Sequence, residues 1–247
     1  MKKEILIGPI AILIIWVLLT SFHLIKPLFL PSPWSVTVDL YNLFASGKIL
    51  GDLEYTLLRW LVGLSVGIII GIPLGMLMGY SNKIYSSLEV AIDFFRSIPA
   101  MTLFPLFLVF FGIGDKAKIA ISAWGAFLFV LINAIYGVKH SREARLMVAK
   151  ALRANKIQTF IKIILPDALP EIAAGVRISI SLSLILVVAS EMLMGTRLGL
   201  GKRIYEAGLI YNMTEMYATI LIAGLLGYLS NKLFYMVETR LVHWGGK

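Results

Sequence analysis

The chain alternates long apolar runs with short polar segments. Five runs approach the length of about 20 residues that a helix needs to cross a bilayer, and they cover residues 5–21, 61–80, 119–138, 178–194 and 216–235. A sixth span over residues 88–113 is less regular, because it encloses Glu89, Asp93, Arg96 and Pro99. The pattern predicts an all-α membrane protein with about six transmembrane helices in one domain over residues 1–247.

The first apolar run follows the letters MKKE and resembles a secretory signal peptide. It is long, however, and lacks a clear small-residue cleavage site before SFHLIKP, so we expect a retained first helix. Residues 30–49, LPSPWSVTVDLYNLFASGKI, have a mixed pattern that predicts a short amphipathic helix at the outer interface, with Trp34 and Tyr41 as anchors.

Five glycines recur at every fourth position of the second span, GLSVGIIIGIPLGMLMG: Gly63, Gly67, Gly71, Gly75 and Gly79. In water each interior helix glycine costs roughly 1 kcal/mol relative to alanine. In hydrocarbon the backbone stays helical and small residues let neighbouring helices approach closely. Because a fourth residue lies about 40° further round the axis, the glycines form a slowly winding stripe. We expect a ridge for helix packing; the alternative is that the ridge also slides or bends during a working cycle.

Composition agrees with a membrane protein. The chain is 59% hydrophobic, has a mean hydropathy of +0.86 and contains 15% charged residues, against about 25% in soluble domains. There is no cysteine, which excludes a disulfide framework and a thiolate metal site. The net charge of +9 does not indicate a nucleic-acid partner, because the basic residues are not interleaved with aromatic ones on a soluble domain.

The distribution of Lys and Arg predicts the orientation. If both termini are cytoplasmic, the inside segments carry twice as many of these residues as the outside segments, which satisfies the positive-inside rule. Most of the difference comes from residues 139–171, which hold seven of the 23 basic residues and form the longest connection that can face the cytoplasm. Function is therefore expected in this loop.

Within that loop, residues 147–172 read MVAKALRANKIQTFIKIILPDALPEI. The first part predicts an amphipathic helix with apolar faces between Lys150, Arg153 and Lys156. Pro166 and Pro170 are expected to stop the helix just before the chain re-enters the bilayer. A surface helix with clustered bases can bind anionic lipid or dock into a groove on a partner.

The same segment resembles the EAA motif of ABC importer permeases, E-A-A-x-x-x-G-x9-I-x-L-P. The named positions of the motif fall on Met147, Val148, Ala149, Arg153, Ile163, Leu165 and Pro166. Met147 replaces the glutamate and Arg153 replaces the glycine, and the second change puts the usual local geometry in question. Arg153 then either makes a charge contact with an ATPase, lies on a solvated basic face or contacts a lipid phosphate.

Three more stretches are similar to permeases of the nitrate, sulfonate and taurine importers: LPSPWSV, RSIPAMTLFPLFLVFFGIG at 96–114 and EMLMGTRLGLGKRIYEA at 191–207. The resemblance therefore covers nearly the whole chain. It implies a type I importer in a prokaryotic inner membrane, in which a homodimer of permeases forms the pathway, two cytoplasmic ATPases dock on the loops and an external binding protein delivers the solute. The implied cargo is a nitrate-, sulfonate- or taurine-like anion that moves inward by alternating access.

The resemblance also implies a coupling element over residues 147–166. Its expected ATPase-coupling residues are Ala149, Leu152, Arg153, Ala154, Asn155, Lys156, Ile163, Leu165 and Pro166. The chain has no phosphate-binding G-x-x-x-x-G-K-[ST] loop, so we expect no enzyme and no cofactor here, with ATP and Mg²⁺ in the partner ATPase. The histidines lack a metal-ligand spacing, and we expect no metal site.

Four polar residues are candidates for the translocation path: Arg96, Ser179, Ser183 and Glu191. Ionisable groups within a membrane are functional candidates by default, but each residue has a structural alternative. Arg96 can pair with Asp93 on one helix face, the serines can hydrogen-bond between packed helices, and Glu191 can hold a contact between a helix and a loop. Pro99 and Pro105 are expected to bend the third span.

Two other functions stay open at this point. An ion- or proton-driven secondary transporter would use Asp93, Arg96 and Glu191 for coupling, and its uptake would survive ATP depletion. A membrane scaffold whose basic loop recruits a soluble protein would move no solute. The lack of a visible inverted repeat weakens the first alternative, and the family resemblance weakens both.

Overall fold

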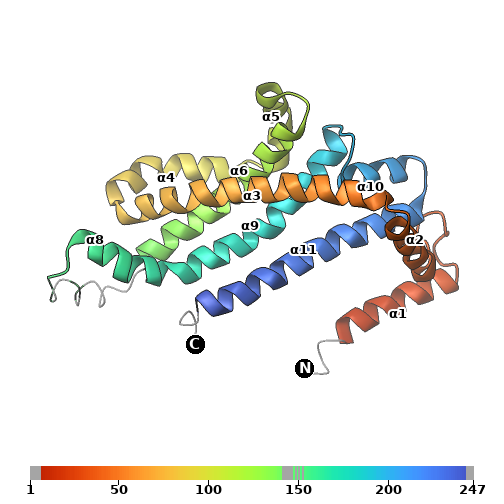
Figure 1. Ribbon diagram of the computed structural model, residues 1–247, viewed down its shortest axis with the longest axis horizontal. Coiled ribbons are helices and arrows are strands. Elements are labelled where there is room, and N and C mark those ends of the chain that lie inside the picture. The colour runs from red at the N-terminus through yellow and green to blue at the C-terminus, as the bar shows by residue number, and fades with distance from the viewer. Residues whose placement is uncertain (1–6, 141–146, 148, 150, 152, 243–247) are drawn as a thin grey trace.

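The computed structural model describes residues 7–140, Met147, Ala149, Ala151 and residues 153–242. All regular structure in this part of the chain is helical. Figure 1 shows an elongated bundle whose longest helices run lengthwise. These helices are α3 (Lys48–Tyr80), α6 (Asp115–Lys139), α9 (Leu165–Leu193) and α11 (Met213–Leu241).

Shorter helices complete the bundle: α1 (Ile7–Ser21), α2 (Pro33–Ala45), α4 (Asn82–Ser97), the 3₁₀ turn η2 (Ala100–Leu103), α5 (Phe104–Phe111), α8 (Lys156–Thr159), the π turn η3 (Phe160–Ile164) and α10 (Leu200–Leu209). The amphipathic helix predicted within residues 30–49 is present as α2. The hydroxyl of Ser32 caps it by accepting a hydrogen bond from the Ser35 amide, and the chain then turns into α3 at Gly47, whose φ is +71°.

The glycine stripe of α3 lies directly against α6. A Cβ atom added to Gly67 would stand 2.6 Å from the Cβ of Ala126, and one added to Gly75 would stand 2.6 Å from the Cβ of Ala134. The stripe continues in the same way through Gly63, Gly71 and Gly79, which face Ser122, Phe127 and Val138. The two backbones are therefore as close as glycine and small side chains allow.

The main core lies between α3, α6 and α9. Its buried members on α9 follow a helical spacing: Ala168, Ile172, Val176, Ile180, Leu184 and Val187. Trp60 of α3 adds a polar link, because its indole nitrogen donates to the Ile180 carbonyl at 3.1 Å and to the Ser183 hydroxyl at 2.9 Å. The three helices form one packed unit.

The predicted all-α membrane fold is confirmed. By length and composition, four helices of the described part can cross a membrane: α3, α6, the continuous helix Lys156–Leu193 and Met213–Arg240. A fifth span is present if α4 and the helical segment Ala100–Phe111 count as one. The apolar helix α1 is shorter, at 15 residues.

The span predicted over residues 88–113 is bent at Pro99, as expected from the sequence, but not at Pro105, where a bend was also expected. The helix breaks at Ile98 and Pro99, and the two halves meet at 91°. Proline lacks an amide proton and restricts the residue before it to extended conformations, and Ile98 has a φ of −79° and a ψ of 121°. Pro105 causes no further break, because it lies in the first turn of α5, where proline is tolerated.

Pro166 and Pro170 do not stop the helix that leads into α9, and this expectation is also wrong. Helix α8, the π turn η3 and α9 are continuous from Lys156 to Leu193. A proline ring collides with the carbonyl four residues earlier in a regular α-helix. The wider π turn immediately before Pro166 changes that local geometry, so the helix continues.

We predict that Gly67→Val destabilises the protein by at least about 1–3 kcal/mol, the usual cost of overpacking, because the new side chain must displace the α6 backbone. The matched control is Gly224→Val, since nothing lies within 4 Å of a Cβ at Gly224. Thermal unfolding of the detergent-purified protein measures the difference. Equal losses of stability in the two variants would contradict the packing role of the stripe.

Candidate functional site: the coupling segment and the polar cluster joined by α9

The described part of the coupling segment contains a left-handed turn. Met147, Ala149 and Ala151 are helical, and the Ala154 amide then bonds to the Ala149 carbonyl at 3.0 Å. Arg153 has a φ of +51° within this turn. Leu152, one of the expected coupling residues, lies outside the described residues.

Arg153 adopts the conformation that the motif's glycine would favour. A left-handed backbone costs a non-glycine residue about 1–2 kcal/mol, and glycine adopts it freely. Arg153 thus has a backbone that glycine would adopt without strain, with a side chain added.

Asn155 starts the next helix with a reciprocal cap. Its side-chain oxygen accepts from the Gln158 amide at 2.8 Å, and the Gln158 side chain accepts from the Asn155 amide at 3.1 Å. This capping box fixes where the helix begins. The exposed face that follows carries Lys156, Ile157 and Ile161, a mixture of charge and apolar surface that suits a protein partner.

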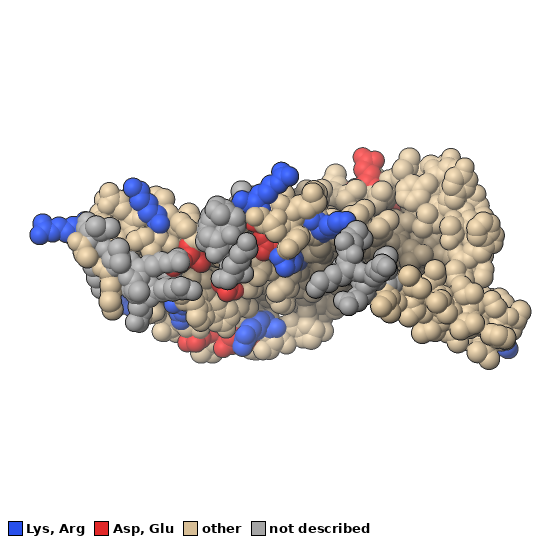
Figure 2. Space-filling model, turned by 90° about the horizontal axis from the view of Figure 1, so that it is seen from below, with Lys and Arg blue, Asp and Glu red and all other residues tan. Residues whose placement is uncertain are grey.

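The opposite face of the segment packs onto the bundle. The Phe160 ring meets the Tyr80 ring edge-on with centroids 5.7 Å apart, and Ile164 is buried in the main core. Ile163, Leu165 and Pro166 are half-buried. Figure 2 shows that charged side chains on this face of the molecule gather toward the end that carries α8, whereas the other end is almost uncharged.

A buried polar cluster lies at the other end of α9. We call Asp52, Thr56, Arg59, Asp115 and Glu191 the Arg59 cluster. The Arg59 guanidinium donates to Glu191 at 2.6 Å, to Asp115 at 2.8 Å and to the Leu198 carbonyl at 2.8 Å. Arg59 and Glu191 are each 1% exposed, so the charges are enclosed and satisfied within the protein.

The loop after α9 is tied to this cluster by its backbone. Glu191 accepts hydrogen bonds from the Thr56 hydroxyl and the Gly201 amide, both at 2.9 Å, and Asp52 accepts one from the Gly199 amide at 2.8 Å. Gly199 has a φ of +149°, and a Cβ there would lie 2.5 Å from the Glu191 carboxyl carbon. Only glycine fits this approach.

Arg203 extends the polar contacts toward α10 and α11. It donates to Asp52 at 2.6 Å and to Glu215 at 2.5 Å. Burial disfavours its charged form, but the hydrogen bonds to the two carboxylates outweigh burial and raise the pKa of Arg203 above its ordinary value. Asp52, Arg203 and Glu215 thus hold α3, α10 and α11 together, and Asp52 also binds the loop that contains Gly199.

The candidate path residues are not brought together. The Ser179 hydroxyl donates to the Ala126 carbonyl at 3.0 Å, and Ser183 accepts from Trp60, so both serines lie in the core between helices. Glu191 contacts the loop described above. Arg96 is exposed on α4 and pairs with Asp93 at 3.0 Å.

Sequence reasoning identified Glu191 but missed its main partner. Arg59 lies 132 positions away along the chain, and nothing in the local sequence links the two residues. The available signal was a single arginine at the edge of an apolar run, where an unpaired charge is costly. In the described part of the chain, no group of three or more metal-binding side chains was found.

Comparison with known proteins places these features in a family. Residues 67–243 match the model described as "Binding-protein-dependent transport system inner membrane component". The chain is 32% identical over 247 residues to the taurine transport system permease protein TauC of Escherichia coli, which covers 98% of this chain and 90% of that protein. It is 30% identical to the putative aliphatic sulfonates transport permease protein SsuC of Bacillus subtilis, over 97% of this chain and 86% of that protein.

A similar structure has also been solved. A chain of the MetNI methionine ABC transporter, in an inward-facing conformation, matches with a TM-score of 0.67 and 25% identity, covering 79% of this chain and 95% of that chain. These comparisons confirm the resemblance that the sequence motifs indicated.

We predict that Arg59→Leu lowers the free energy of unfolding by about 3–5 kcal/mol, because it leaves the buried Glu191 carboxylate without its counter-charge. The double variant Arg59→Leu/Glu191→Leu should recover part of the loss. The control is Arg197→Leu, because Arg197 is an exposed arginine in the loop after α9. Chemical unfolding in detergent measures all three variants, and similar values for Arg59→Leu and Arg197→Leu would refute the structural role.

Proposed function

Because this chain belongs to the family of binding-protein-dependent transport system inner membrane components, we propose that two copies of it form the solute pathway of an ATP-driven importer. The chain has the fold and the relatives of an ABC importer permease. Two ATPases at the cytoplasmic face and an external binding protein complete the assembly. ATP and Mg²⁺ are held in the ATPases, whereas this chain carries the solute inward by alternating access.

The observation that carries this proposal is the placement of the motif segment. One face contacts the ends of α3 and α6 through Phe160 and Ile164, and the other exposes Lys156, Ile157 and Ile161. A segment packed on one side and free on the other can receive a partner and pass its movement to the spans. Its basic charge favours a cytoplasmic position, and in the same orientation we propose that both termini are cytoplasmic.

Helix α9 provides the mechanical connection. The continuous helix Lys156–Leu193 has 38 residues and is about 57 Å long at 1.5 Å per residue. It begins in the coupling segment and ends at Glu191 in the Arg59 cluster. Displacement of the segment by the ATPase therefore moves the loop after α9, which lies at the external face in this orientation.

The cargo is proposed from the relatives. TauC is described as a taurine permease and SsuC as a permease for aliphatic sulfonates, so we propose a small sulfonate-type solute.

Co-purification in mild detergent from the native membrane tests the assembly, and uptake into vesicles tests the energy source. A stoichiometric ATPase and uptake that stops on ATP depletion are expected. Uptake that survives ATP depletion but collapses with the ion gradient would refute the proposal and favour a secondary transporter.

We predict that the turn at Arg153, and not its charge, is required for coupling. Arg153→Gly and Arg153→Asn should retain solute-stimulated ATP hydrolysis, because both residues tolerate a left-handed backbone. Arg153→Val removes the same charge but cannot adopt this backbone without strain, and it should uncouple the complex. Thermal unfolding of the isolated permease serves as the control for folding. Loss of coupling in all three variants would show that the charge itself is needed.

A further inference from the structure

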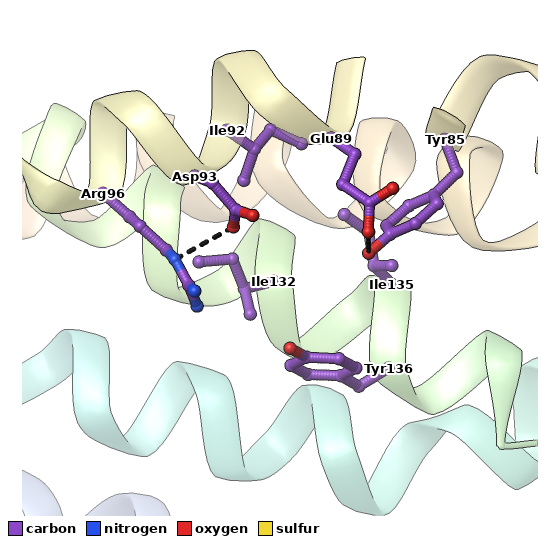
Figure 3. A pocket seen from close by; sticks show the side chains of 8 residues that line it. All are labelled: Tyr85, Glu89, Ile92, Asp93, Arg96, Ile132, Ile135 and Tyr136. Atoms are coloured by element: carbon purple, nitrogen blue, oxygen red, sulfur yellow. Dashed lines mark hydrogen bonds and ion pairs between the residues drawn. The ribbon is translucent and has the colours of Figure 1, made fainter. Parts of the chain in front are cut away.

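The polar face of α4 lies outside both the coupling segment and the Arg59 cluster. Tyr85, Glu89, Asp93 and Arg96 recur at helical spacing, and Figure 3 shows them pointing from α4 toward α6. The side chains of Asp93 and Arg96 are 56% and 50% exposed. A charged, half-exposed face is unusual beside a membrane-spanning helix, and it requires an explanation.

The position of this face along α6 shows that it lies at membrane depth. At one end, the Lys139 ammonium lies over the Tyr85 ring, 2.8 Å from its centre. At the other end, the Phe95 ring contacts the Trp124 ring with centroids 5.5 Å apart. Helix α6, residues 115–139, is long and apolar enough to cross a membrane, and α4 follows it from the Lys139 end toward its middle.

Charged groups at this depth are not compatible with lipid. An ionised side chain in hydrocarbon is costly, and such residues face the interior of a bundle or a water-filled cavity. The backbone gives independent support, because α4 breaks at Ile98 and Pro99, two residues beyond Arg96. Non-helical backbone at membrane depth occurs only where protein covers it or where it lines such a cavity.

The polar side chains of this face contact one another when no solute is present, and of the two carboxylates only Asp93 has a counter-charge among them. Arg96 pairs with Asp93 at 3.0 Å, and the Tyr85 hydroxyl donates to Glu89 at 2.7 Å. The enclosed space among these residues is about 20 Å³, enough for roughly one water molecule. A solute must therefore bind at the open side of the cleft and not within it.

A half-exposed ion pair is weak, so a solute can replace it. The charges of the solute determine whether both residues of the pair keep a counter-charge. An anion bound to Arg96 leaves the Asp93 carboxylate without a counter-charge, and a cation bound to Asp93 leaves Arg96 without one. A solute that carries both charges satisfies both residues.

We infer that the polar face of α4 is a solute-binding site in the translocation pathway, and that it selects small zwitterions, with the anionic group on Arg96 and the ammonium group on Asp93. Glu89, held by Tyr85, adds negative potential on the ammonium side. The inference rests on the proposed function, because it needs this face to line the pathway.

Binding of three probes of similar size to the purified complex of permease and ATPase tests the inference. The probes are 2-aminoethanesulfonate, ethanesulfonate and ethylammonium, and calorimetry measures their affinities. We expect 2-aminoethanesulfonate to bind at least tenfold more tightly than either singly charged probe. Asp93→Asn should remove this preference over ethanesulfonate, and Arg96→Gln should weaken binding of both sulfonates.

The control variant is Glu54→Gln, because Glu54 is an exposed carboxylate on α3 outside the cleft; it should leave all three affinities unchanged. Equal binding of the zwitterion and the anion, or a preference that survives Asp93→Asn, would overturn the inference. So would the absence of binding by any probe in a complex that hydrolyses ATP normally. If no ATPase accompanies the permease, the proposed function itself fails, and this result is distinguishable from the others.

Discussion

The close contact between α3 and α6 is the constraint on which the rest of the bundle depends. Lipid gives helices no hydrophobic reason to associate, so their packing relies on van der Waals contact between closely approaching backbones. Gly67 and Gly75 allow this approach against Ala126 and Ala134. Because α3 and α6 are fixed side by side, they present a joint surface on which α9 packs.

That surface gives α9 a fixed path between two chemically different ends. The N-terminal end carries the segment predicted to couple, and the C-terminal end holds the buried Glu191 against the buried Arg59. Between them, the Ser179 and Ser183 hydroxyls and the Trp60 indole bind backbone carbonyls or each other, which leaves no polar group of these three residues to lipid. A helix held in this way moves as one piece, as the proposed transmission from an ATPase requires.

Most of the spans could be predicted from the sequence, because about 20 apolar residues in a row have few alternatives to a transmembrane helix. The predictions that failed concern prolines, because the local backbone geometry determines whether a helix continues through a proline. Proline at position 99 breaks a helix and proline at position 166 does not, since a π turn precedes the second. No pattern in the sequence separates these cases.

Less of the candidate site could be predicted, because some of its residues are far apart along the chain. Motif spacing predicts a coupling segment, since its residues are close along the chain, and its role stays a prediction. The partner of Glu191 could not be found, because Arg59 comes from a distant helix and the ion pair exists only after α3 and α9 have packed. The structure also shows that Arg153 has a left-handed backbone, which residue identity alone argued against.

Two of the ion pairs in the bundle, Arg59–Glu191 and Asp93–Arg96, differ in burial, and burial determines what each can do. Arg59 and Glu191 are enclosed and bonded to the backbone of a loop, so separating them would leave a charge without water or partner. Such a pair fixes structure and cannot exchange its partners for a solute. Arg96 and Asp93 have the same chemistry but about half of each side chain is exposed, so water can replace either partner at little cost. Of these two pairs, the exposed one suits the proposed binding of a solute that arrives and leaves in every cycle, whereas the enclosed one is suited to keeping the loop after α9 attached to α3.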